Sequence, residues 1–311
     1  MNGASTPLYP SPTFLDSDLS LVRMTSGQYP EDHWVRLNDL DIHYLDWGGD
    51  RTKDPLLLMH GIGRHAHMFD DFVLKMSDKW HVYAMDARGC GDSDWSREGY
   101  SVQAFASDVA AFVQKLGIFP INYFGHSQGS RIGMALGAYY GQMVDHLILG
   151  DYGPFPDPSS KGKATAMQRL QGAPAEAPKG FFSEQAAFDW HVQNGPKMAA
   201  EETLELIRNT YRTNWDGILV PKTDPEIMWL KGRTALKEGP FLWDCVSRIT
   251  CKTLILRGEQ STVLDREQAD KMAITIPDEN GIVDEVPGAG HGLHNENLQD
   301  TVSIIRRFLE M

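Results

Sequence analysis

The sequence contains few cysteines and has a deficit of basic residues. Its 311 residues include only three cysteines, Cys90, Cys245 and Cys251. So sparse and odd a set supports neither a disulfide framework nor a zinc site, and it is typical of a reducing compartment. The 29 lysines and arginines stand against 42 acidic residues, for a formal charge of −13. Such a charge repels phosphate backbones and anionic lipid surfaces, so nucleic acid is not an expected partner.

Long apolar runs are also missing. Residues 1–19 lack the basic cluster and apolar run of a secretory signal. No uninterrupted apolar stretch approaches the roughly 18 residues that a membrane span needs. We therefore expect a cytoplasmic protein without a membrane partner. Residues 1–30, in which prolines and serines recur, predict an N-terminal arm with little regular structure.

Beyond the arm, short apolar runs alternate with amphipathic segments. Two runs around Asn38-Asp39 predict an antiparallel hairpin. The later runs are too short for helices and predict interior parallel strands; they cover residues 55–59, 81–85, 121–124, 146–149, 252–256 and 281–286. Segments with helical periodicity lie between them, at residues 67–76, 101–116, 128–140, 265–276 and 298–309. The alternation predicts an α/β fold with a mostly parallel sheet flanked by helices.

This alternation stops between residues 155 and 243. The stretch is rich in proline and contains only short helical patterns. We interpret it as a mostly helical cap inserted into a core made of residues 31–154 and 244–311. Its many aromatic residues predict a largely apolar or aromatic substrate pocket, although most of them are expected to pack the cap itself.

One strand–turn–helix pattern carries a chemical motif. In Gly125-His126-Ser127-Gln128-Gly129, the serine follows a short apolar strand and precedes a helix built on small residues. The glycines let strand and helix approach closely, and the sharp turn exposes the serine at its apex. Serine is a poor nucleophile until a base takes its proton, so a histidine is required.

Among eleven histidines, His291 is the best placed base. It lies in a glycine-rich loop after the last predicted strand and before the last predicted helix. In a doubly wound sheet that loop is at the same carboxyl edge as Ser127. The order of serine before histidine also agrees with this arrangement.

A tetrahedral oxyanion needs backbone N–H donors. The glycine-rich turn His60-Gly61-Ile62-Gly63 follows the strand at residues 55–59. We expect the N–H groups of Ile62 and Gln128 to form the oxyanion hole. His60 is expected to be a structural hydrogen-bonding residue beneath this turn, and residues 86–93 are expected to form a tight turn at the mouth of the site.

Taken together, these motifs resemble those of α/β-hydrolases of the cap-bearing esterase, lipase and epoxide-hydrolase-like group. The matching segments are residues 57–61, 86–93, 125–129 and 288–291, in family order. The resemblance implies an α/β-hydrolase fold with a mostly parallel, eight-stranded sheet. Epoxide hydrolases and haloalkane dehalogenases carry an aspartate nucleophile, whereas this chain has Ser127, so the resemblance implies a serine hydrolase.

The acid of the triad departs from the commonest pattern of the family. That pattern places an aspartate three or four residues after the glycine that ends the seventh strand, where this chain has Ser261 and Thr262. The imidazole still needs a carboxylate at the same sheet edge. Asp151, at the end of the sixth strand, is our candidate, and Asp265 and Glu259 remain alternatives.

The sequence therefore predicts a Ser127–His291–Asp151 hydrolase that cleaves an ester or lactone bond of a small molecule through an acyl-enzyme. Two alternatives remain: hydrolysis of a carbon–carbon bond in a vinylogous diketone, and a non-catalytic small-ligand receptor on the same fold. Paired histidines without carboxylates or thiols at ligand spacing do not indicate a metal site. No cofactor is implied, and a homodimer is left open.

Overall fold

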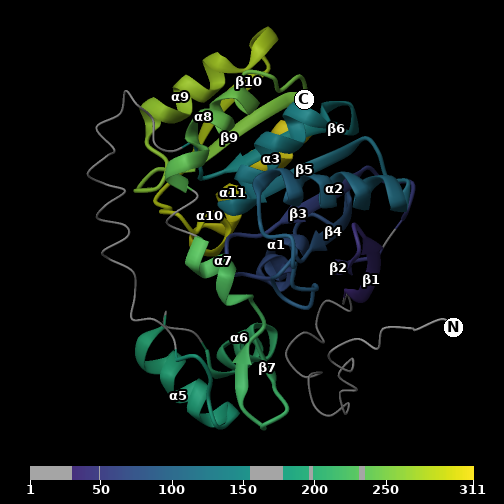
Figure 1. Ribbon diagram of the computed structural model, residues 1–311. Coiled ribbons are helices and arrows are strands. Elements are labelled where there is room, and N and C mark those ends of the chain that lie inside the picture. The colour runs from purple at the N-terminus through teal and green to yellow at the C-terminus, as the bar shows by residue number, and fades with distance from the viewer. Residues whose placement is uncertain (1–29, 49, 155–177, 196–198, 231–234) are drawn as a thin grey trace, which may run out of the picture.

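The computed structural model describes residues 30–48, 50–154, 178–195, 199–230 and 235–311 (Figure 1). The predicted arm up to residue 29 and residues 155–177 of the predicted cap lie outside the described residues. Within the described residues, no helix is both long enough and apolar enough to cross a membrane.

The core is an eight-stranded sheet in the order β1-β2-β4-β3-β5-β6-β9-β10. The strands are β1 (Glu31–Leu37), β2 (Leu40–Asp46), β3 (Pro55–Met59), β4 (His81–Met85), β5 (Ile121–His126), β6 (Val144–Gly150), β9 (Lys252–Gly258) and β10 (Gly281–Val286). β1 and β2 form an antiparallel hairpin, and β2 pairs antiparallel with β4. All pairs from β4 to β10 are parallel. The predicted fold class is therefore confirmed, and the segments that follow the six parallel strands all begin at one edge of the sheet.

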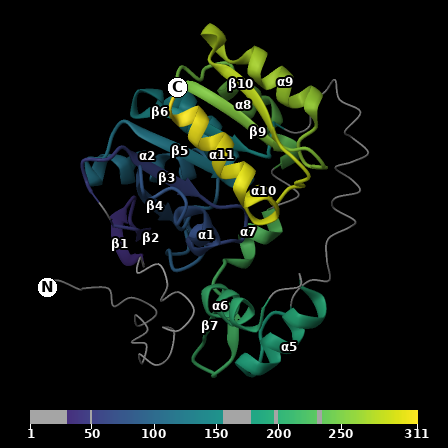
Figure 2. The ribbon, with the colours of Figure 1, turned by 180° about the vertical axis from the view of Figure 1, so that it is seen from behind.

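Helices cover both faces of the sheet. One face is covered by α2 (Val102–Leu116), α3 (Gln128–Tyr139), α8 (Ala235–Val246) and α9 (Arg266–Thr275). The other carries α1 (Asp70–Val73), α10 (Leu293–Glu296) and α11 (Leu298–Leu309), and Figure 2 shows α11 lying across it. Leu57 and Leu58 of β3 belong to opposite clusters because successive side chains of a strand point to opposite faces. Both faces of the central strands are buried, as their continuous apolar runs predict.

The predicted helix at residues 67–76 is shorter in the structure. A 3-10 helix at Ala66–Phe69 leads into α1, which ends at Val73. Hydrogen bonds such as Met76 N–H to Val73 O, at 2.8 Å, then continue as tight turns. The apolar spacing nevertheless identified the buried side, since Phe72 and Met76 are both fully buried.

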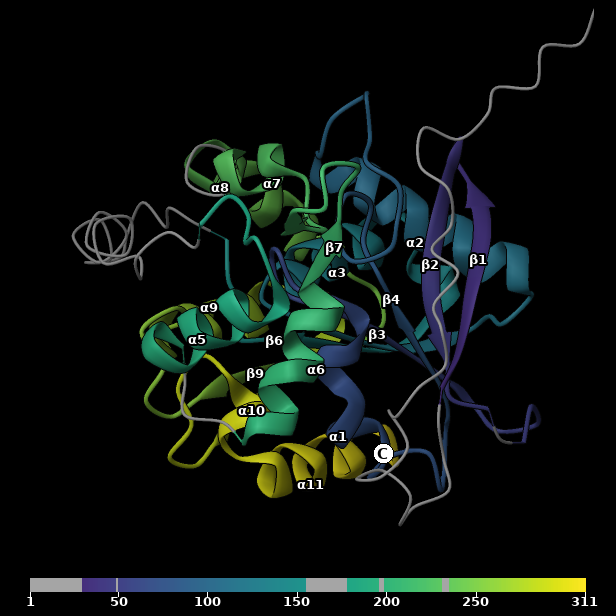
Figure 3. The ribbon, with the colours of Figure 1, turned by 90° about the horizontal axis from the view of Figure 1, so that it is seen from below.

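The described part of the predicted cap contains more than helices. It comprises α5 (Glu184–Asn194), α6 (Ala200–Thr210), a two-stranded hairpin of β7 (Tyr211–Thr213) and β8 (Leu219–Pro221), and α7 (Pro225–Leu230). Figures 1 and 3 place α5, α6 and β7 outside the main sheet, on the side of α7 and α10. The expected boundary between residues 243 and 244 falls within α8, whose Leu242 and Cys245 are buried against the sheet.

Candidate active site

The turn between β5 and α3 holds Ser127 in a backbone conformation that few residues adopt. Its φ is 56° and its ψ is −107°, and a positive φ is uncommon outside glycine. The Ser127 N–H donates to Gly150 O at 2.8 Å. A Cβ on Gly129 would lie 2.2 Å from Met59 O, and one on Gly125 would lie 2.3 Å from the Gly129 carbonyl. The two glycines are therefore needed for the close approach that positions the serine.

His291 and Asp151 lie in line with this serine. His291 Nε2 is 3.1 Å from Ser127 Oγ, and His291 Nδ1 is 2.7 Å from Asp151 Oδ2. The Asp151 side chain is completely buried, whereas that of His291 is 37% exposed. An ionised carboxylate only accepts hydrogen bonds, so the imidazole proton resides on Nδ1. Nε2 is then free to accept the hydroxyl proton of the serine.

The two alternative acids are engaged elsewhere. Asp265 is the N-cap of α9 and accepts the Gln268 N–H at 2.8 Å. Glu259 accepts the Gly288 N–H at 2.7 Å. Both side chains are exposed. The structure therefore brings Asp151 to His291, and it brings neither alternative there.

The predicted oxyanion turn lies directly beside the serine. The Arg64 N–H donates to Gly61 O at 3.1 Å and closes this turn. Within it, Gly63 has a φ of +68°. A Cβ on Gly61 would be 3.4 Å from Ser127 Cβ. Gln128 is the first residue of α3, where a helix leaves its N–H without an intrahelical acceptor. Ile62, inside the turn, and Gln128 therefore flank the serine from two elements.

A buried network supports this turn, as predicted for His60 and the loop after β4. His60 Nδ1–H donates to Gly61 O at 2.7 Å, and His60 Nε2 accepts the Ala87 N–H at 3.0 Å. Burial lowers the pKa of His60, which keeps the ring neutral, as these two bonds require. Asp86 accepts the Ala66 N–H at 2.6 Å. His60 is therefore a structural hydrogen-bonding residue, as expected.

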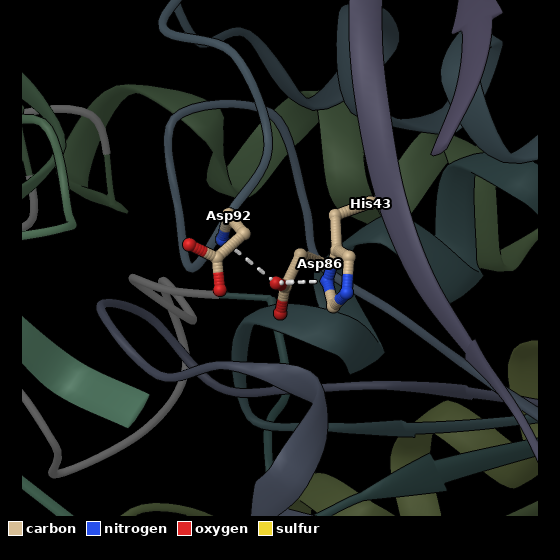
Figure 4. A group of neighbouring side chains, drawn as sticks. All are labelled: His43, Asp86 and Asp92. Atoms are coloured by element: carbon tan, nitrogen blue, oxygen red, sulfur yellow. Dashed lines mark hydrogen bonds and ion pairs between the residues drawn. The ribbon is translucent and has the colours of Figure 1, made fainter. Parts of the chain in front are cut away.

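A cluster of possible metal ligands lies nearby, and its charges are already paired. Figure 4 shows His43, Asp86 and Asp92, whose ligand atoms lie within 4.8 Å of one another. Asp86 Oδ2 accepts His43 Nδ1 at 2.7 Å, and Lys222 Nζ donates to Asp92 at 2.6 Å. Burial opposes the charge on His43, but its hydrogen bonds to Asp32 and Asp86 raise its pKa to about 10. A metal ion would have to displace the proton of His43 and the contacts it makes, and the contacts present are those of hydrogen-bonded ion pairs.

Another histidine beside the triad was not anticipated from the sequence. His126 Nε2–H donates to the backbone O of His291 at 2.7 Å, and the two ring centroids are 4.9 Å apart. Burial, with repulsion from His291, lowers the pKa of His126 to about 4, so the ring is neutral near pH 7. Its only sequence signal is its place next to the serine in the motif. His126 therefore supports the backbone of the loop that carries His291.

The segment around α7 covers the predicted oxyanion turn. The Asp224 N–H donates to Gly89 O at 2.8 Å, and Thr223 Oγ lies 3.4 Å from Gly63 O. A Cβ on Gly63 would lie 2.8 Å from Met228 Sδ. The side chain of Met228 is 48% exposed. A flexible, half-exposed apolar side chain thus lies against Gly63 of the predicted oxyanion turn, attached to an anchored segment.

The described aromatic residues of the predicted cap differ in their surroundings. Phe181 is buried in a small cluster with Ala187, Ile207 and Tyr211. By contrast, Phe182 and Trp215 are 88% and 75% exposed. The expectation of packing within the cap therefore holds for Phe181, whereas Phe182 and Trp215 face solvent and Phe241 and Trp243 pack against the core of the sheet.

A surface hollow of about 420 Å³ lies at the opposite edge of the sheet. It is lined by residues that begin β6 and β9, among them Val144 and Lys252. Because Ser127 follows the carboxyl end of β5, this hollow is separate from the candidate active site.

Comparisons with known proteins agree with this architecture. The sequence profile described as alpha/beta hydrolase fold matches residues 54–298. The chain is 27% identical to the 3-hydroxybutyrate-oligomer hydrolase of Cupriavidus necator over 260 residues, 80% of this chain and 86% of the relative. It is 26% identical to an sn-1-specific diacylglycerol lipase of Mus musculus over 296 residues, 92% of this chain and 89% of the relative. The crystal structure of E-2-(acetamidomethylene)succinate hydrolase superposes with a TM-score of 0.75 at 22% identity, covering 91% of this chain and all of that one. The chain belongs to the alpha/beta hydrolase fold family, and it is a hydrolase.

Proposed function

We propose that this hydrolase is a serine esterase or lactonase that uses Ser127, His291 and Asp151 as its catalytic triad. The observation that carries the proposal is the line of contacts from Ser127 Oγ to His291 Nε2 at 3.1 Å and from His291 Nδ1 to Asp151 at 2.7 Å. Serine, imidazole and carboxylate in this order form the constellation that activates a hydroxyl for attack on a carbonyl.

In the proposed reaction, Ser127 Oγ attacks the ester carbonyl carbon while its proton passes to His291 Nε2. Asp151 stabilises the resulting imidazolium through Nδ1–H, and the N–H groups of Ile62 and Gln128 bind the oxyanion. His291 then protonates the alkoxide as the C–O bond breaks, releasing the alcohol and leaving an acyl-serine. Water, deprotonated by His291, attacks the acyl group and releases the carboxylic acid and the free serine.

The substrate class is supported by the environment of the triad and by one relative. Met228 gives the entrance an apolar wall, which suits a small, largely apolar or aromatic acyl group. A diacylglycerol is a carboxylic ester, and the named relatives include a diacylglycerol lipase. We therefore propose a carboxylic ester or a lactone as the substrate, with no cofactor taking part.

Covalent labelling tests this proposal. A fluorophosphonate should label Ser127 in the wild-type chain, and labelling should vanish in His291→Ala. His33→Ala is the matched control because His33 is on β1, away from the triad, and it should label normally. Incubation with p-nitrophenyl butyrate should yield butyrate and p-nitrophenol. Folded protein that is neither labelled nor hydrolytic would contradict the triad and favour a binding module.

A further inference from the structure

Ser261 contacts the same carboxylate oxygen as the imidazole. Ser261 Oγ is 2.6 Å from Asp151 Oδ2, and His291 Nδ1 is 2.7 Å from that atom. Ser261 lies in the loop between β9 and α9, three residues after Gly258. Ser261 follows β9, whereas Asp151 follows β6, so the contact joins two neighbouring loops at the carboxyl edge of the sheet.

The hydroxyl proton of Ser261 has a defined direction. Ser261 Oγ accepts the Val263 N–H at 3.0 Å and the Leu264 N–H at 3.3 Å. These two donors occupy the accepting side of the oxygen, which leaves the hydroxyl proton for Asp151. The side chain of Asp151 is fully buried, so water does not compete for this bond. Ser261 is therefore a fixed donor to the carboxylate.

Two donors together fix the rotation of the carboxylate. Asp151 Oδ1 accepts the Gly258 N–H at 3.1 Å, and Oδ2 accepts the Ser261 hydroxyl. The terminal torsion of an aspartate is soft, so one bond alone would leave the group free to pivot. With both oxygens held, Oδ2 stays aimed at His291 Nδ1.

We propose that Ser261 is a positioning residue for the triad: its hydroxyl holds the Asp151 carboxylate in the orientation that accepts the His291 Nδ1–H. The inference rests on the proposed function. Ser261 does not touch the reacting atoms, and it acts by holding the plane of the Asp151 carboxylate.

Steady-state kinetics with p-nitrophenyl butyrate test the positioning role. Ser261→Ala should lower kcat about 30-fold, which corresponds to about 2 kcal/mol, the size of a hydrogen bond to a charged group. KM should be unchanged because the substrate is not contacted. Ser261→Thr retains the hydroxyl and should recover kcat to within about threefold of wild type. Thr262→Ala, at the exposed neighbouring position, is the matched control and should keep wild-type kcat.

A second readout separates positioning from a general structural effect. Thermal unfolding of Ser261→Ala should stay cooperative, and its loss should fall on kcat alone, whereas a disordered loop would change both kcat and KM. The inference is overturned if Ser261→Ala keeps wild-type kcat, or if Ser261→Thr loses as much kcat as Ser261→Ala. If Asp151→Asn itself keeps wild-type kcat, the proposed acid of the triad has failed, which is a different result.

Discussion

Replacing Asp151 by asparagine is the sharpest perturbation of the proposed mechanism. The amide oxygen can keep the bond from the Gly258 N–H, which now reaches Oδ1 at 3.1 Å. The amide NH₂ then takes the place of Oδ2, 2.7 Å from His291 Nδ1. Two donors cannot face each other at that distance, so the imidazole must move its proton to Nε2. That proton would point at Ser127 Oγ, and the base would be lost.

The expected loss of kcat in Asp151→Asn follows from this wrong tautomer of His291. Loss of a triad acid with the geometry otherwise retained lowers turnover by about 10⁴, equivalent to about 5 kcal/mol of transition-state stabilisation. We expect Asp151→Asn to lose kcat for p-nitrophenyl butyrate by this factor. The folded fraction of the variant should be measured by circular dichroism, so that unfolded protein is not counted as slow enzyme; fluorophosphonate labelling cannot serve here, because it needs the same base.

Two substitutions at the alternative acids are the matched controls. Asparagine caps a helix about as well as aspartate, so Asp265→Asn should keep the start of α9. Glu259→Gln retains an oxygen that can accept the Gly288 N–H. Both variants should stay within about twofold of wild-type kcat. A large loss in either one, together with an active Asp151→Asn variant, would refute the assignment of the acid.

Three further predictions concern the pH dependence of stability, the turn between β5 and α3, and selectivity for the acyl chain. The pKa of His43 rises from 6.5 to about 10 in the folded chain, so its stabilising contribution is complete below pH 6.5 and is lost as pH rises towards 10. The difference in unfolding free energy between wild type and His43→Gln, measured by urea denaturation, should shrink by about 1.4 kcal/mol per pH unit between pH 7 and 9.5; a flat difference would contradict the ion pair. Gly129→Ala should abolish fluorophosphonate labelling, because its Cβ would lie 2.2 Å from Met59 O. Normal labelling would show that the turn between β5 and α3 can shift enough to accommodate a side chain. Met228→Ala should raise kcat/KM for p-nitrophenyl octanoate relative to the acetate by about tenfold, as more room admits more methylenes, and an unchanged ratio would place the acyl group elsewhere.

The fold could be predicted because the interior strands are buried on both faces. Such strands are continuous apolar runs, and their alternation with amphipathic helices restricts the topology to a few choices. The segment at residues 67–76 was the exception. Its apolar spacing of four is shared by a helix and by the succession of 3-10 helix, α1 and turns, since both bury Phe72 and Met76. Periodicity identified the buried side there, and it did not identify the hydrogen-bonding pattern.

For the candidate site, the ends of the predicted strands showed which residues would lie together, but the sequence did not show which side-chain hydrogen bonds they would make. Ser127 and His291 follow different parallel strands, and the rule that such loops share an edge placed them together. Ser261 stood out only because it occupies the usual position of the acid, and His126 only because it precedes the serine, so the sequence predicted neither of their contacts. Each acts through a hydrogen bond to a group distant in sequence, Ser261 on Asp151 and His126 on the backbone of His291. Such contacts depend on rotamers and loop paths, which residue types do not reveal.

The position of the proposed acid, Asp151, follows from strand adjacency more than from any one spacing in the sequence. β6 pairs in parallel with β9, and Gly150 is opposite Leu256 in the register. Neighbouring strands are about 4.8 Å apart, so the loops that follow them start side by side. The Asp151 N–H even donates to Leu256 O at 2.8 Å, extending the ladder beyond β6. An imidazole above these two loops needs a carboxylate oxygen at one point in space, and either loop can supply it. A sequence motif that expects the acid at a fixed spacing after β9 therefore misses a carboxylate that reaches the same point from the end of β6.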